Sequence, residues 1–177
     1  MKVTVIEPST GNPQLKDPND LSVGIRLDYL GKSFLFVGDM EDHAEETWLE
    51  KLSPELLKLA DVDVLKVGHH GSDTSSTPEF IAHVSPRLAF ISCGAPNVGT
   101  NSGYKHPRLS TLETYRTWFA AHPPAAIDPQ PKQVPAYNAV TKKWVTVLRP
   151  QGLYLTSVDG NLTVQTDGVK FYVSKTK

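Results

Sequence analysis

Two short stretches of the chain decide its fold: FLFVGD at residues 34–39 and VDVLKVGHHGS at residues 62–72. Each is a run of apolar, strand-forming residues that ends in a glycine next to an ionisable side chain. Asp39 follows the first run, and His69 and His70 follow the second. Ligands and metals collect at the carboxyl ends of the strands in open α/β sheets, so we expect these three side chains at one edge of a sheet.

The flanking patterns predict strands and helices that alternate along the chain. Apolar alternation predicts strands over 3–6 and 23–27, and the turn YLGK at 29–32 predicts that strand 23–27 pairs antiparallel with 33–37. Helical spacing over 40–52 predicts an amphipathic helix with its glutamates on the polar side, and Pro54 begins a further short helical turn. Further strands are expected at 61–67, 88–93, 144–148, 152–156, 162–164 and 171–173, the last four as a hairpin-rich sheet edge, and further helices at Pro78 and Ser110. Ser76 or Thr77 is expected to cap the helix at Pro78.

Composition indicates one globular α/β domain over residues 1–177, with a proline-rich excursion near 122–143. The formal net charge of -1 excludes a global positive field that would attract nucleic acid or anionic lipid, although a local basic groove stays open. A single cysteine, Cys93, excludes an intramolecular disulfide. No apolar run reaches the roughly 20 residues of a membrane span, so we expect a soluble chain, cytoplasmic if it stands alone.

The polar residues after the strands have the chemistry of a metal site. Asp39, His69, His70 and His106 all lie in loops near glycines, and imidazole with carboxylate is a ligand set for zinc or manganese. A carboxylate can also bridge two metal ions, and such a site activates water for attack on an ester or phosphodiester.

Each of these residues also has a structural interpretation. Asp39 alone is more often a turn or helix-capping residue, and His106 before Pro107 is more often a loop histidine than a ligand. Residues 72–75 are expected to cap, although a hydroxyl or amide there could contact a phosphate. Three histidines are expected to be solvated and are left out of the site: His43, His83 and His122.

Several motifs together resemble the metallo-β-lactamase-fold domain of the ComEC/Rec2 competence proteins and of their stand-alone hydrolase relatives. They are NDLS at 19–22, FVGD at 36–39, ADVDVLKVGHHGS at 60–72, SPRLAFIS at 85–92, YKHP at 104–107, GLYLT at 152–156 and DGNLTV at 159–164. The resemblance implies an αββα sandwich in which Asp39 bridges two metal ions. It implies His69 as a ligand with His70 beside it, and His106 as a further ligand or a proton donor to the leaving group.

One part of the family pattern has no counterpart here. Family members carry an earlier His-x-His-x-Asp-His motif that supplies most ligands of a dinuclear site, whereas this sequence contains no His-x-His and its first histidine is His43. The resemblance therefore implies the C-terminal half of the sandwich, incomplete at its N-terminus. A missing partner sheet would leave an apolar face exposed.

Taken together, these patterns predict a metal-dependent hydrolase that acts on a phosphodiester such as a DNA strand. The expected partners are single-stranded DNA or another phosphodiester, and an N-terminal half-domain or partner chain that completes the site. The first alternative is a truncated or degenerate domain that acts by binding a protein partner. A weaker alternative is a hydrolase of a small ester or lactone.

Overall fold

The computed structural model describes residues 1–6, 17–50, 61–124 and 131–176. Its strands are β1 (Lys2–Ile6), β2 (Gly24–Tyr29), β3 (Lys32–Phe36), β4 (Val64–Lys66), β5 (Leu88–Ile91), β6 (Lys132–Asn138), β7 (Lys143–Arg149), β8 (Leu153–Leu155), β9 (Asn161–Thr166) and β10 (Phe171–Thr176). Its helices are α1 (Asp42–Glu50), α3 (Pro78–Val84), α4 (Asn101–Tyr104), α5 (Leu109–Ala121) and α6 (Thr156–Asp159), with 3-10 turns η1 (Pro18–Leu21) and η2 (Gly68–Gly71).

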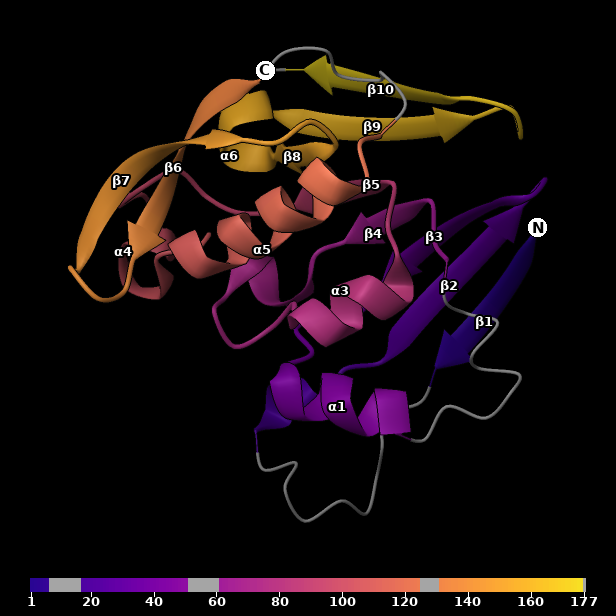
Figure 1. Cartoon of the computed structure of the whole chain (residues 1–177), viewed down its shortest axis with the longest axis horizontal. Helices are drawn as coiled ribbons and strands as arrows, with labels where there is room; N and C mark the ends of the chain where they lie inside the picture. Colours follow the sequence, from indigo (N-terminus) through magenta and orange to yellow (C-terminus); the bar gives the residue numbers. More distant parts are fainter. Residues whose placement is uncertain (7–16, 51–60, 125–130, 177) are drawn as a thin grey trace.

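A six-stranded sheet in the order β1-β2-β3-β4-β5-β8 forms the centre of the molecule (Figure 1). Strands β1, β2 and β3 pair antiparallel, and the β2–β3 pairing is the one that the turn at 29–32 predicts. Strands β3, β4, β5 and β8 pair parallel, so their carboxyl ends lie at one edge of the sheet. This topology places Asp39 and the histidine pair at that shared edge, as the order of motifs predicted.

One face of the sheet packs against helices α1, α3 and α5. Their apolar residues form a single core with the inward residues of β3, β4, β5 and β8, and Val134 and Ala136 of β6 join it. The Pro78 helix is capped by Thr77, whose side chain accepts the Phe80 N–H at 3.2 Å. Burial of the apolar residues of these helices against the sheet supplies the main driving force for folding.

The opposite face of the sheet is covered over part of its width. The β9–β10 hairpin packs Leu162, Val164, Phe171 and Val173 against Val64, Leu88 and Tyr154. Toward β1 the same face carries Val3, Val5, Ile25 and Phe36, which are 52%, 59%, 38% and 40% exposed. The exposed apolar face that the sequence led us to expect is therefore present at the β1–β3 side of the described sheet.

Several predicted elements differ from the structure. Strand β4 spans only Val64–Lys66 of the predicted 61–67, although the Val67 N–H still donates to the Phe90 carbonyl of β5 at 2.9 Å. Helix α5 has Arg108 at its N-cap rather than Ser110. Helix α4 forms in the polar segment after β5 that contains Gly94, Gly99 and Gly103. Within the proline-rich excursion, residues 132–138 form β6, which pairs antiparallel with β7.

The C-terminal strands do not form one hairpin-rich edge. Strand β8 enters the central sheet parallel to β5, whereas β6–β7 and β9–β10 are separate two-stranded sheets. Between the strands expected at 152–156 and 162–164, Asp159 ends the short helix α6 and Gly160 is its C-cap. The helical turn predicted at Pro54, and the end of the helix predicted over 40–52, lie outside the described residues. Within the described segments, no helix has the length and apolarity that a membrane span requires.

Candidate metal centre

The four residues predicted for the site line a single pocket of about 430 Å³. Asp39, His69, His70 and His106 share its wall with Asn19, Ser92, Cys93, Gly94, Thr100, Asn101 and Tyr104. The pocket lies at the edge of the sheet where the parallel strands β3, β4 and β5 end. The structure thus brings together every side chain that the sequence assigned to the site.

A glycine turn delivers Asp39 to the pocket. Gly38 adopts φ +61, and a Cβ there would lie 3.0 Å from the side chain of Ser22, so only glycine fits without strain. The Ser22 hydroxyl accepts the Asp39 N–H at 3.1 Å. The carboxylate remains 38% exposed, with Lys66 Nζ 3.8 Å and His70 Nε2 3.4 Å from Oδ1.

Lys66 is the cation beneath this turn. It donates to the Gly38 carbonyl at 2.9 Å while its charge faces Asp39. Burial lowers the pKa of Lys66, and the neighbouring Asp39 carboxylate opposes that shift. The lysine therefore supports both the backbone and the side chain of the aspartate turn.

His69 and His70 occupy a left-handed turn rather than an extended continuation of β4. Their φ values are +41 and +53, a conformation that costs a non-glycine residue about 1–2 kcal/mol. Hydrogen bonds from the His69 N–H to the Gly38 carbonyl and from the Ser72 N–H to the His69 carbonyl hold the turn. Strand alternation would point the two rings to opposite faces, but this turn places both in the pocket.

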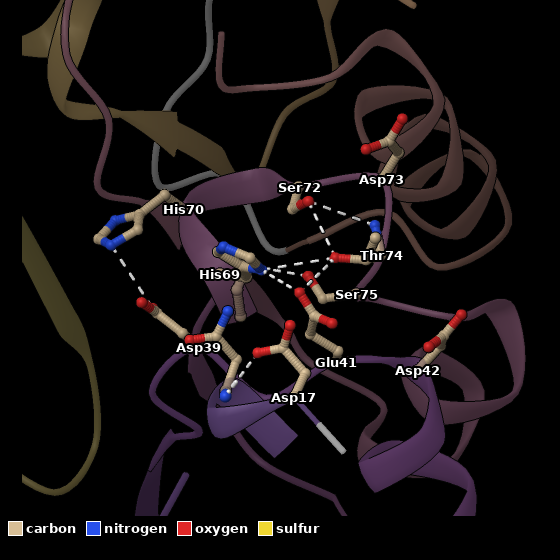
Figure 2. Close-up of polar contacts among 12 residues, drawn as sticks. Asp17, Asp39, Glu41, Asp42, His69, His70, Ser72, Asp73, Thr74 and Ser75 are labelled. Atoms are coloured by element: carbon tan, nitrogen blue, oxygen red, sulfur yellow. Dashed lines mark hydrogen bonds and ion pairs between the residues drawn. The ribbon is translucent and has the colours of Figure 1, made fainter. Parts of the chain in front are cut away.

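The Nδ1 atom of His69 has a defined partner. It lies 2.8 Å from Glu41 Oε1 (Figure 2). A carboxylate oxygen accepts hydrogen bonds, so Nδ1 of the neutral ring carries the hydrogen and Nε2 keeps a free lone pair. The His69 ring also packs edge-on against His106 at a centroid distance of 5.4 Å.

His70 reaches the same protonation pattern through a different acceptor. Its Nδ1 lies 2.7 Å from the Ser92 carbonyl oxygen, which can only accept, so this nitrogen also carries the hydrogen. On a neutral ring the lone pair of Nε2 then faces Asp39 Oδ1 at 3.4 Å. Two acceptors in this arrangement repel each other, and a proton or a cation near both atoms removes the repulsion.

His106 is the most enclosed histidine of the pocket. It is 6% exposed, and its Nδ1 is buried without a hydrogen-bond partner in the described structure. Burial, followed by the charges of His69 and Arg108, lowers the pKa of His106 to about 4, so the ring is neutral at pH 7. A neutral imidazole offers a lone pair but has no additional proton to give.

Asn101 fixes the backbone of His106. Its side-chain oxygen accepts the His106 N–H at 2.7 Å, and its amide donates to the His106 carbonyl at 2.7 Å and to the Gly94 carbonyl at 2.8 Å. Asn101 is buried in helix α4, so this amide bridges two parts of the loop after β5. This role of Asn101 was not predicted from the sequence, because the residue lies in a polar stretch between Gly99 and Gly103.

The pocket has the donor chemistry of a divalent-metal site, with an incomplete set of ligands. Imidazole Nε2 atoms with their Nδ1–H groups held by acceptors are the form that binds zinc, and Asp39 adds a carboxylate. However, within residues 1–6, 17–50, 61–124 and 131–176, no three His, Cys, Asp or Glu side chains converge closely enough to hold an ion as they stand.

The polar residues around the pocket differ in part from expectation. Glu41 and Glu45 were assigned to the outer side of a helix, but Glu41 contacts His69, and buried Glu45 accepts the N–H groups of Ser76 and Thr77 at 2.6 and 2.8 Å. The histidines left out behave unequally. His43 and His122 are exposed as expected, whereas His83 is half-buried and its Nε2 has no partner within the described structure.

Fold and site together define an α/β protein with an acidic and histidine-lined pocket at the carboxyl ends of parallel strands. No protein-family model matches the chain. It is 34% identical over 109 residues to ComE operon protein 3 of Bacillus subtilis and 37% identical over 91 residues to competence protein ComA of Neisseria gonorrhoeae. It is also 31% identical over 122 residues to recombination protein 2 of Haemophilus influenzae.

These matches cover 62%, 51% and 69% of this chain, respectively. They cover only 12%, 12% and 14% of the three relatives, so the chain corresponds to a small segment of much longer proteins. Their names, a ComE operon protein, the competence protein ComA and recombination protein 2, confirm at that level the resemblance predicted from the motifs.

Proposed function

We propose that this chain binds a divalent metal at the pocket for phosphodiester hydrolysis, with a DNA strand as the substrate. The observation that carries the proposal is the protonation pattern of the histidine pair. Both Nδ1–H groups are held by acceptors, Glu41 Oε1 at 2.8 Å and the Ser92 carbonyl at 2.7 Å, which leaves both Nε2 atoms unprotonated on neutral rings. Similarity to competence proteins supports DNA as the substrate.

The fold proposed with this function is a metallo-β-lactamase-like αββα sandwich. One helix layer on a sheet, with a second apolar face covered in part by β9–β10, supports this assignment. The exposed residues at the β1–β3 side of that face are then where a second sheet would pack, from an N-terminal half-domain or a partner chain.

In the proposed mechanism the residues of this chain bind and orient. Zinc or manganese at such a site supplies Lewis acidity toward a phosphodiester oxygen and activates water. Asp39 would hold it through its carboxylate, His69 and His70 would offer Nε2 lone pairs, and His106 would offer one ring nitrogen. Since His106 is neutral at pH 7, its ligand role is favoured over that of proton donor to the leaving group.

The test is metal analysis of the purified chain together with hydrolysis of bis-p-nitrophenyl phosphate. We expect bound zinc or manganese after equilibration and removal of free ion, and a loss of both metal and turnover in Asp39→Ala. Asp28→Ala is the matched control, because Asp28 lies on β2 and pairs with Arg26 away from the pocket. Absence of metal, or turnover that Asp39→Ala leaves unchanged, would refute catalysis by this chain.

A second candidate function is a non-catalytic domain that binds a protein partner. The observation in its favour is the exposed apolar strip of Val3, Val5, Ile25 and Phe36, together with the absence of a converging three-donor group among the described residues. It predicts that Val5→Lys with Ile25→Lys abolishes association measured by sedimentation velocity. Under this function Asp39→Ala leaves association unchanged.

A further inference from the structure

Glu41 links the pocket to the loop that follows the histidine turn. One of its carboxylate oxygens, Oε1, lies 2.8 Å from His69 Nδ1 and 2.9 Å from Thr74 Oγ1 (Figure 2). Thr74 Oγ1 also lies 3.4 Å from His69 Nδ1, so the three groups form a closed triangle. The side chains of His69 and Glu41 are only 17% and 15% exposed.

The direction of each hydrogen bond in this triangle follows from the chemistry of its members. An ionised carboxylate accepts, so both His69 Nδ1–H and the Thr74 hydroxyl donate to Glu41 Oε1. With its hydrogen committed, Thr74 Oγ1 accepts from the Ser72 hydroxyl at 3.0 Å. The Ser72 oxygen in turn accepts the Thr74 N–H at 3.3 Å. Each hydrogen bond in this network therefore has one defined donor and one defined acceptor.

The backbone holds the triangle in register. Glu41 immediately precedes α1, and the next residue, Asp42, donates its N–H to the Thr74 carbonyl at 2.7 Å. Glu45, one turn further along α1, accepts the N–H groups of Ser76 and Thr77. The segment 41–45 is thus bonded at two points to the segment 74–77, which keeps Glu41 facing His69.

We propose that Glu41 is the positioning residue of His69, with Thr74 as its second anchor. The pair keeps the neutral His69 ring in the Nδ1–H form and sets its orientation, so that Nε2 presents its lone pair to the pocket. The importance of this arrangement for metal binding rests on the proposed function, but the arrangement itself can be measured without any metal.

The experiment is a long-range ¹H–¹⁵N correlation spectrum of the metal-free chain with labelled histidine. We expect the neutral His69 ring in the Nδ1–H form in the native chain. Glu41→Ala removes the acceptor and shifts His69 toward the Nε2–H form. Glu41→Gln keeps an amide oxygen as acceptor, so we expect most of the His69 population to remain in the Nδ1–H form. A purely structural role of Glu41 would not produce this result.

Two further variants test the geometry. Thr74→Val keeps the shape of the side chain but removes one donor to Oε1, and we expect a smaller shift in the same direction as Glu41→Ala. Asp42→Ala is the matched control, because this neighbouring carboxylate accepts the His43 N–H at 2.8 Å and is exposed to solvent. It should leave the His69 spectrum unchanged.

Metal titration separates this inference from the proposed function. If the chain binds zinc, Glu41→Ala should weaken the affinity about 10- to 100-fold, as loss of an orienting carboxylate does at other sites. A native tautomer that Glu41→Ala and Thr74→Val leave unchanged would overturn the positioning role, whatever the hydrolytic activity. The expected tautomer shift in a chain that binds no metal would support the positioning role and refute the proposed function.

Discussion

Asp39 and Asp159 are two aspartates of one molecule whose carboxylates differ in the number of polar partners around them. Asp159 is 4% exposed, and it accepts the Leu155 N–H at 3.0 Å and a hydrogen bond from buried Arg149. Lys132 and Lys175 lie 3.4 and 3.7 Å from its other oxygen. Asp39 is 38% exposed and has one lysine at 3.8 Å and one imidazole at 3.4 Å.

The difference shows how the same side chain serves structure or chemistry. The lone pairs of Asp159 are occupied by partners from β7, β8 and β10, so it ties the C-terminal strands to the central sheet. Those of Asp39 face a pocket together with three histidines. A carboxylate whose partners are complete stabilises the fold, whereas one with free coordination capacity can bind a ligand.

Asp159, Arg149, Lys132 and Lys175 form the Asp159 cluster. The largest effect is expected when this cluster loses the charge of its aspartate. Asp159→Asn removes the buried charge that faces Arg149 and should lower the free energy of unfolding by about 3–5 kcal/mol. Urea denaturation measures this loss. In the double variant with Arg149→Met, a smaller loss is expected, because no uncompensated charge is left between these two positions. A single-variant loss below about 1 kcal/mol would contradict the structural role.

Acid should reduce the contribution of Asp159 to the free energy of unfolding. Burial alone raises the pKa of Asp159, but the Leu155 N–H and Arg149 more than offset it, so its pKa lies below the ordinary value of 3.8. The unfolded chain then binds more protons than the native chain near and below that value, so stability falls as pH drops through it. In urea titrations from about pH 6 to 2.5, the difference in the free energy of unfolding between the native chain and Asp159→Asn should become smaller. A difference that stays constant with pH would show that Asp159 is not the titrating group.

Asp39→Asn should affect stability much less. The side chain is partly solvated and its lysine partner keeps the bond to the Gly38 carbonyl, so we expect a change below about 1 kcal/mol in urea denaturation. Turnover of bis-p-nitrophenyl phosphate should nevertheless disappear. A variant as destabilised as Asp159→Asn would mean that Asp39 is a structural residue.

The smallest effect is expected at the rim of the Asp159 cluster. Lys132 is 46% exposed at its side chain and is one of several groups around the carboxylate. Lys132→Met should change the free energy of unfolding by about 0.5 kcal/mol, within the range of solvated ion pairs. Thermal denaturation at low and high salt provides the measurement. An effect comparable to that of Asp159→Asn would show that the lysine, rather than Arg149, dominates the cluster.

The parts of the site that could be predicted from the sequence are those carried by local pattern. Two apolar runs that each end at a glycine were enough to place Asp39 and the histidine pair at one sheet edge, because parallel strands share their carboxyl ends. The Thr77 cap and the β2–β3 hairpin are equally local. Each depends on residues within a few positions of one another.

Other features depend on contacts between distant residues. Glu41 was assigned to an outer helix side because its contact with His69 crosses 28 positions, and β8 was assigned to a hairpin because its pairing with β5 joins residues more than 60 positions apart. The left-handed turn at His69 and His70 also has no local signature, since it is held by bonds to the Gly38 turn and to Ser92.

The sequence by itself determined that Asp39 and the histidine pair follow two strand-forming runs, the identities of the site's aspartate and histidines, and the resemblance to competence proteins, because these depend on residue type and short-range periodicity. The tertiary structure alone decided which atoms of those residues are available. Glu41 and the Ser92 carbonyl hold the Nδ1–H groups, Asn101 holds His106, and Asp159 is enclosed by its cations. The physical reason is that a lone pair is free or occupied according to neighbours that only the folded chain brings within hydrogen-bonding distance.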